Sequence, residues 1–154
     1  MLDNWDELKA NERKASGKKE KAKTSILEDV PIHFPALLEA LKLTKKTAKV
    51  GFDWENTDQI FEKLDEEINE LKRGIEQTDK VNIGEEIGDL LFVLVNLARK
   101  LDIEPETALK KTNRKFRRRF KFIEDELKIN NRDLRDADLT EMDALWNKAK
   151  AQRI

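Results

Sequence analysis

The sequence predicts an all-α protein built as an antiparallel helix bundle. It contains five glycines and three prolines, too few for the closely spaced turns of an all-β protein. Apolar residues recur at spacings of three and four over several long segments, and no long segment alternates apolar with polar residues. Short connections between the longest segments indicate that neighbouring helices run in opposite directions.

Composition limits the class of protein further. The chain has 154 residues, which favours a single domain. Its 31 basic and 32 acidic residues give a net charge of -1, so bulk charge argues against nucleic acid or an anionic membrane as the partner. The absence of cysteine excludes a thiolate nucleophile and a cysteine zinc site, and it fits a reducing cytosol. Since no apolar run is as long as a membrane span, we expect a soluble, cytoplasmic protein.

The chain divides into a basic arm and a helical domain. Residues 1–24 are rich in lysine and poor in apolar side chains, which is typical of a basic N-terminal arm or a marginal helix. Residues 25–154 form the predicted helical domain. Its first helix begins at Pro35, a residue suited to the first turn of a helix, and ends at Gly51.

Two central helices are predicted from a capping pattern and two apolar stripes. Asn56 and Gln59 have the spacing of a capping box, and they open a helix that runs to about residue 77. The next stripe predicts a helix over about residues 83–101, after a short connection around Asp79. Because the connection is short, these two helices should lie side by side and antiparallel.

Two further helices complete the domain. Pro105 opens a long helix that ends near Asn130. Thr140, together with Asp143, predicts the cap of a last short helix.

The two central helices carry carboxylates in matching positions. Glu67 falls inside the apolar stripe of its helix, three residues after Leu64, and Glu70 lies one turn further along. Glu86 and Asp89 repeat this spacing on the shoulder of the next stripe. In antiparallel neighbours the four carboxylates would converge. A charged, solvated helix face is the alternative interpretation of the same spacing.

Converging carboxylates indicate a metal site. Crowded carboxylates repel one another and resist desolvation unless a cation neutralises them. Oxygen ligands without nearby histidine or cysteine favour Mg²⁺, with Mn²⁺ as a possible substitute. The sequence therefore predicts a magnesium site between the two central helices.

The long helix after Pro105 predicts a phosphate-binding surface. Eight basic residues and no acidic residue lie between Lys110 and Lys121. On a helical wheel Arg119 falls within the apolar stripe, and Lys115 lies one turn before it on the same side. Cations facing an acidic metal cluster are what a polyphosphate requires. The alternative is that these cations flank the core, extend to solvent or pair with the acidic helices.

These motifs together resemble those of the MazG family of nucleoside triphosphate pyrophosphohydrolases, which are all-α proteins. The resemblance covers about residues 25–150 and looks like the second module of two-module members. Its motifs are EExxE at 66–70, ExxD at 86–89, KVGFDW at 49–54, an NxKFxRRF-like stretch at 113–120 and a terminal segment at 139–146. One position departs from the pattern, because Asn82 stands where some members have lysine; Lys80 is a candidate substitute.

The resemblance implies a homodimer with shared sites, and hydrolysis of nucleoside triphosphates to the monophosphate and pyrophosphate. The metal ligands that it implies are Glu67, Glu70, Glu86 and Asp89, and the phosphate-binding residues are Lys115 and Arg119. It also places Asn113 and Trp146 near the nucleotide.

From the residues and the resemblance together, we expect a Mg²⁺-dependent pyrophosphohydrolase. Glu66, or an unshared carboxylate oxygen such as one of Glu67, is the candidate general base. Two other classes stay open at this point: a helical nucleic-acid-binding module that uses the segment Lys110 to Lys121, and a non-catalytic helical scaffold.

A second copy of the chain is the expected protein partner. The helix over 83–101 should leave Leu91, Phe92 and Val95 as an apolar face, and such faces usually mark an interface. The predicted core is therefore a four-helix arrangement completed by dimerisation.

Overall fold

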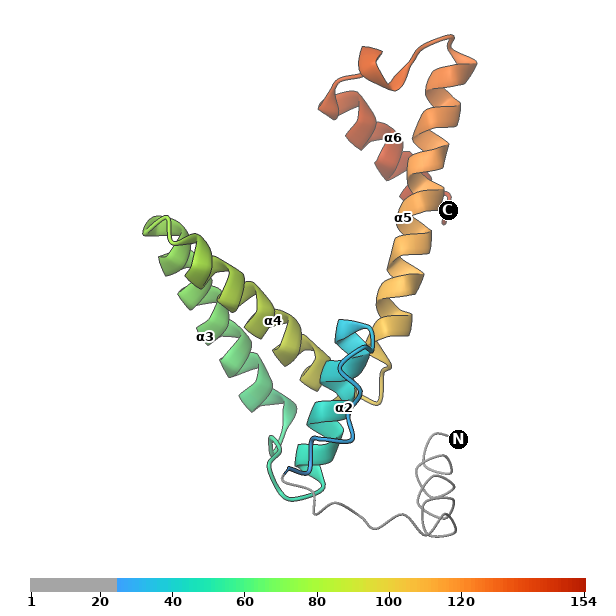
Figure 1. The fold of residues 1–154 in the computed structure, drawn as a ribbon. Coiled ribbons are helices and arrows are strands. Elements are labelled where there is room, and N and C mark those ends of the chain that lie inside the picture. Colours follow the sequence, from blue (N-terminus) through green and yellow to red (C-terminus); the bar gives the residue numbers. More distant parts are fainter. Residues whose placement is uncertain (1–24) are drawn as a thin grey trace, which may run out of the picture.

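Five α-helices and one short 3₁₀ helix make up the part of the chain that the structure describes, residues 25–154 (Figure 1). This computed structural model contains no strand within those residues, so the all-α prediction is confirmed. The predicted basic arm over 1–24 lies outside the described residues. The helices are α2 (Ala36–Ala48), α3 (Thr57–Glu76), α4 (Lys80–Lys100), α5 (Pro105–Ile129), η1 (Leu134–Asp136) and α6 (Leu139–Ala151).

Helices α3 and α4 form an antiparallel hairpin. Asn56 caps α3 as predicted, because its side chain accepts a hydrogen bond from the backbone N–H of Gln59 at 3.1 Å. Asp79 caps α4 by accepting from two backbone N–H groups, so α4 begins at Lys80, three residues before the predicted start. The two helices approach closely at Gly74, where an added Cβ would lie 3.2 Å from the side-chain nitrogen of Asn82. The cap at Asp79 and the close approach at Gly74 therefore fix the two helices at the turn end of the hairpin.

Helices α5 and α6 form a second antiparallel hairpin. Pro105 stands in the first turn of α5 and Asn130 caps its end, both as predicted. The cap of α6 is Asp138, which accepts a hydrogen bond from the backbone N–H of Glu141 at 2.8 Å. The prediction of Thr140 as the cap was wrong. Asp138 has the same three-residue spacing to its N–H donor, and it lies two residues nearer the preceding 3₁₀ helix.

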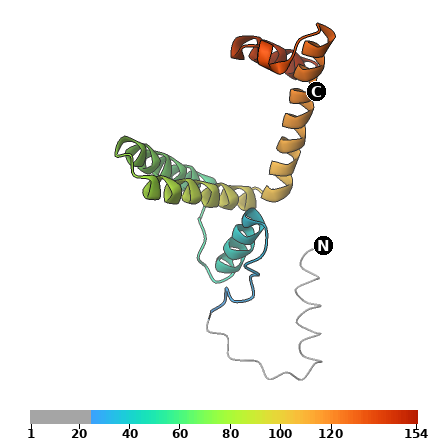
Figure 2. The same cartoon turned by 45° about the horizontal axis from the view of Figure 1, so that its top comes forward.

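Helix α2 packs where the two hairpins meet, against α4 and the beginning of α5 (Figures 1 and 2). The hairpins then diverge, and α5 leads away from the α3–α4 pair. The buried apolar side chains divide accordingly. Before α5 they are Val30, Leu41, Ile60, Val93 and Val95, and on α5 and α6 they are Ile123, Leu127 and Ala149.

An apolar face of the α3–α4 hairpin stays exposed in the single chain. Leu91 is 48% exposed and Phe92 is 40% exposed, as the sequence predicted. Val95 is 1% exposed, so its place on that face was a wrong prediction. The reason is that α2 packs on the end of α4 that carries Val95. Other exposed apolar residues of this hairpin are Phe61, Ile68, Ile75, Val81, Ile87 and Leu94.

Among the helices of residues 25–154, none combines the length and apolar character that a membrane crossing requires.

Candidate metal centre

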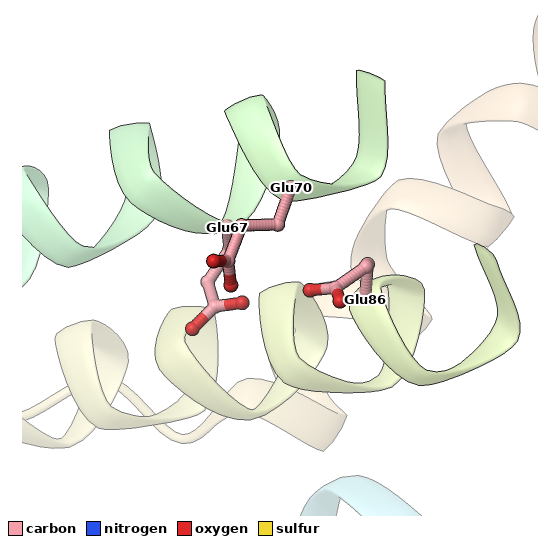
Figure 3. A group of neighbouring side chains, drawn as sticks. All are labelled: Glu67, Glu70 and Glu86. Carbon is pink, nitrogen blue, oxygen red and sulfur yellow. The ribbon is translucent and has the colours of Figure 1, made fainter. Parts of the chain in front are cut away.

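Three carboxylates from the α3–α4 hairpin converge. Glu67 and Glu70 project from α3 and Glu86 projects from α4 toward them (Figure 3). One oxygen from each of the three side chains lies within 4.8 Å of the others. We call this group the carboxylate cluster. All its donors are oxygen atoms, which suits a hard divalent cation.

Glu67 is the buried member of the carboxylate cluster. It is 4% exposed, because its position in the apolar stripe turns it toward α4. One of its oxygens lies 2.7 Å from Nζ of Lys63, one turn earlier on α3. Hydrogen bonds to Glu67 and then to Glu66 raise the pKa of Lys63 above its ordinary value. The lysine thus compensates part of the charge that burial makes costly.

Glu86 carries an unsatisfied oxygen. Its Oε2 atom is buried and has no hydrogen-bond partner within the described structure. Burial raises the pKa of Glu86, and the neighbouring carboxylates of Glu67, Glu70 and Asp89 raise it further. A buried acceptor that lacks a donor and is surrounded by like charge is what a cation site looks like without its cation.

Asp89 is the fourth predicted ligand, and it lies beside the carboxylate cluster rather than in it. Its side chain is exposed on α4, one turn after Glu86. It is close enough to add to the repulsion that Glu86 experiences. The structure therefore brings together three of the four predicted carboxylates and leaves the fourth at their edge.

Two hollows lie along α3, and one of them shares residues with the carboxylate cluster. One, of about 300 Å³, is lined by Glu70, Arg73, Gln77, Asn82 and Glu86. The other, of about 350 Å³, is lined by Trp54, Gln59, Glu62, Lys63 and Glu66. Each contains a cation from α3 that pairs with a glutamate three or four residues away. The sequence analysis missed Lys63 and Arg73, although helical i,i+3 and i,i+4 spacing was the available signal.

The predicted phosphate-binding residues lie elsewhere in the single chain. Lys115 is exposed on α5. Nε of Arg119 donates to the backbone carbonyl of Ile154 at 3.0 Å, and its guanidinium lies 5.5 Å from the ring centroid of Trp146. Asn113 is also exposed on α5. Because α5 leads away from α3 and α4, one chain does not bring these residues to the carboxylate cluster (Figures 1 and 2).

The loop before α3 is anchored by an ion-pair network that the sequence did not predict. Asp53 pairs with Arg99 and with Lys100, whose Nζ lies 3.1 Å from Oδ2 of Asp53. The hydrogen bond from Arg99 is the main cause that lowers the pKa of Asp53 to about 2. This network joins the loop to the last turn of α4, so it fixes where α3 begins relative to α4.

Part of the chain is similar to a known protein domain. Residues 55–123 match the MazG nucleotide pyrophosphohydrolase domain. The matched range contains α3, α4 and the basic part of α5. It therefore includes the carboxylate cluster together with Asp89, Lys115 and Arg119.

Three relatives show how far the similarity extends. The chain is 39% identical to the nucleoside triphosphate pyrophosphohydrolase of Escherichia coli strain K12, over 100% of this chain and 57% of that protein. It is 39% identical to the nucleoside triphosphate pyrophosphohydrolase/pyrophosphatase MazG of Thermotoga maritima, over 95% of this chain and 54% of that protein. It is 47% identical to the uncharacterized protein YabN of Bacillus subtilis strain 168, over 97% of this chain and 30% of that protein.

The helical hairpin and its facing carboxylates define an all-α protein with a candidate site for a divalent cation. Residues 55–123 are similar to the MazG nucleotide pyrophosphohydrolase domain. The chain spans about half the length of the Escherichia coli and Thermotoga maritima relatives.

Proposed function

We propose that this protein is a Mg²⁺-dependent enzyme that hydrolyses nucleoside triphosphates to the monophosphate and pyrophosphate. The observation that carries the proposal is the carboxylate cluster, with one buried oxygen of Glu86 that has no donor. The names of the Escherichia coli and Thermotoga maritima relatives support the reaction class. We also propose that the protein acts in the cytoplasm.

The residues of the hairpin fit the metal. Its proposed ligands are Glu67, Glu70, Glu86 and Asp89, with Mn²⁺ as a substitute for Mg²⁺. When bound, the cation neutralises charge on the phosphate oxygens and lowers the pKa of a bound water.

Glu66 is the proposed general base, with an unshared oxygen of Glu67 as the alternative. Glu66 is the more exposed of the two, and its Oε1 accepts a hydrogen bond from Nζ of Lys63 at 2.9 Å. Because Glu66 is accessible to solvent, its carboxylate can accept a proton from a water molecule.

A homodimer is the proposed assembly, in which Lys115 and Arg119 bind phosphates and Asn113 and Trp146 lie near the nucleotide. The exposed apolar face at Leu91 supports an interface. The charges on α5 support an anionic ligand, because several of its basic side chains form no ion pair within residues 25–154, among them Lys111, Arg114, Lys115, Arg117 and Arg118.

Those same unpaired cations favour a second candidate function, the binding of nucleic acid by α5. Binding of that kind would weaken steeply as salt increases and would not require Mg²⁺. The carboxylate cluster has no role in it, and we therefore rank it second. A non-catalytic scaffold is the third candidate, and it predicts no turnover.

Product analysis tests the proposed function. The protein is incubated with each common nucleoside triphosphate and Mg²⁺, and the products are resolved by phosphorus NMR. We expect monophosphate and pyrophosphate as the initial products. Diphosphate with inorganic phosphate would refute the proposed cleavage position, and the absence of turnover with every triphosphate would contradict the proposed activity.

A further inference from the structure

A furrow between the end of α3 and the start of α4 opens from the carboxylate cluster. It is the hollow of about 300 Å³ described above. Two of its lining residues, Glu70 and Glu86, also belong to the carboxylate cluster, so the furrow and the cluster share a wall. Gln77 and Asn82 are neutral, and Arg73 is the single cation among the lining residues. A ligand in the furrow would therefore lie beside both the proposed metal ligands and Arg73.

Arg73 is paired with Glu70, a carboxylate that would also ligate the metal. Its Nη2 donates to Oε1 of Glu70 at 2.9 Å. When a divalent cation ligates that carboxylate, it neutralises the charge that attracts the guanidinium, and the ion pair weakens. The Arg73 side chain is 63% exposed, so it can turn within the furrow without losing buried contacts.

The charges of the residues that line the furrow indicate which group Arg73 would bind after leaving Glu70. Two carboxylates and one guanidinium leave the empty furrow negative. A divalent cation offsets the charge of these carboxylates, and Arg73 is then the cationic side chain among the lining residues that can attract an anion. A guanidinium matches the geometry of phosphate oxygens and forms paired hydrogen bonds to them.

We propose that Arg73 is a substrate-binding residue that leaves Glu70 and binds a phosphate group of the triphosphate when a divalent cation occupies the carboxylate cluster. This inference rests on the proposed function, since it takes the triphosphate as the substrate. Arg73 has opposite effects on the two ligands: it competes with the metal for Glu70 and attracts the substrate.

The test compares Arg73→Ala and Arg73→Lys with Lys72→Ala. Lys72 is the adjacent exposed cation on α3 and does not line the furrow, so its loss controls for net charge. KM and kcat are measured for a nucleoside triphosphate at saturating Mg²⁺, and the Kd of Mn²⁺ alone is measured without nucleotide by electron paramagnetic resonance. Far-UV circular dichroism checks that each variant is folded.

We expect Arg73→Ala to raise KM about tenfold or more, with a smaller change in kcat. Arg73→Lys should recover part of the loss, and Lys72→Ala should stay within about twofold of the original protein. Without nucleotide, Arg73→Ala should bind Mn²⁺ as tightly as the original protein or more tightly, because the competing cation is gone.

The following results would overturn the proposal. Equal KM values for Arg73→Ala and Lys72→Ala would show that the furrow does not hold the phosphate. Weaker Mn²⁺ binding by Arg73→Ala would show that Arg73 supports the carboxylate cluster instead of competing for it. An original protein that hydrolyses no triphosphate would overturn the proposed function together with this inference, whereas an active protein that is insensitive to Arg73→Ala would overturn this inference alone.

Discussion

At the residue scale, the charges of the carboxylate cluster are held in two different ways. Glu67 is compensated by Lys63 at 2.7 Å, whereas Oε2 of Glu86 is buried without a donor. Neutralising Glu67 would remove one of the two carboxylates that Lys63 binds. Neutralising Glu86 would relieve repulsion from its neighbours. A substitution at Glu86 should therefore affect metal binding without lowering the stability of the metal-free fold, which makes it the better test position.

Asp53 gives a stability prediction with a defined pH dependence. Its pKa of about 2 in the folded protein lies below the ordinary value of 3.8, so its contribution is present above pH 3.8 and is lost as the pH falls toward 2. Because the side chain is 23% exposed, solvent screens the network, and Asp53→Asn should cost about 1 kcal/mol at pH 7. Urea denaturation measures the free energy of unfolding.

Urea denaturation is then repeated at lower pH. The difference in free energy of unfolding between the original protein and Asp53→Asn should shrink between pH 4 and pH 2. Asp65→Asn, at an exposed position of α3 without an ion pair among the described residues, should change the free energy of unfolding by less than about 0.5 kcal/mol. A difference for Asp53→Asn that is the same at both ends of the pH range would contradict the ion-pair account.

Residue positions on a helix could be predicted from the sequence, but what each position meets could not. The stripe containing Glu67 correctly predicts that its carboxylate faces the neighbouring helix. The same wheel places Lys115 and Arg119 on one inward side of their helix. In the structure Lys115 is exposed, and Arg119 contacts Trp146 of α6 and the carbonyl of Ile154 beyond that helix. Spacing within one helix defines a face, whereas the partner of that face depends on how the hairpins diverge.

At the element scale, the caps determine where each helix begins. The sequence predicts α3 and α5 with their starts, because Asn56 caps α3 and Pro105 stands in the first turn of α5. It misplaces the start of α4, because the apolar spacing begins later than the cap Asp79. It misplaces the start of α6, because Thr140 is also a suitable capping residue and lies two residues after the actual cap, Asp138. Capping depends on one side chain reaching a free backbone N–H, and this is a local property that periodicity does not detect.

The cap of α6 can be tested by a pair of substitutions. Asp138→Ala removes the acceptor of the Glu141 N–H and should lower the free energy of unfolding by about 1 kcal/mol. Thr140→Ala, at the position that the sequence alone predicted, should change it by less than about 0.5 kcal/mol. Thermal melts followed by circular dichroism provide the comparison, and a larger loss for Thr140→Ala would restore the original prediction.

At the scale of the whole molecule, the single chain leaves apolar and cationic surfaces without a partner. The α3–α4 hairpin exposes Leu91 and Phe92, and α5 carries its unpaired basic residues away from the carboxylate cluster. The sequence predicts these surfaces, but it contains no direct information on how two chains are placed. Dimerisation stays a prediction, and a dimer is the simplest arrangement in which α5 of one subunit reaches the carboxylates of the other.

Sedimentation velocity tests the dimer. We expect the original protein to sediment as a dimer at micromolar concentration and Leu91→Lys to shift it toward monomer, because a charge at the buried centre of an interface is costly. Leu139→Lys is the matched control, since Leu139 is an exposed leucine on α6, outside the hairpin. A monomer at all concentrations, or equal effects of the two substitutions, would contradict this interface.

The most direct test of the account is the response of folding stability to Mg²⁺. Melting curves are recorded at matched ionic strength, with and without Mg²⁺, for the original protein, Glu86→Gln and Glu85→Gln, the last at an exposed neighbouring position on α4. Mg²⁺ should stabilise the original protein and Glu85→Gln by about 2.7 kcal/mol when free metal is a hundred times its dissociation constant. Without Mg²⁺, Glu86→Gln should melt at the same temperature as the original protein or higher. With Mg²⁺, Glu86→Gln should show little of the stabilisation seen in the original protein. Equal Mg²⁺ responses in all three proteins would contradict a metal site at the carboxylate cluster.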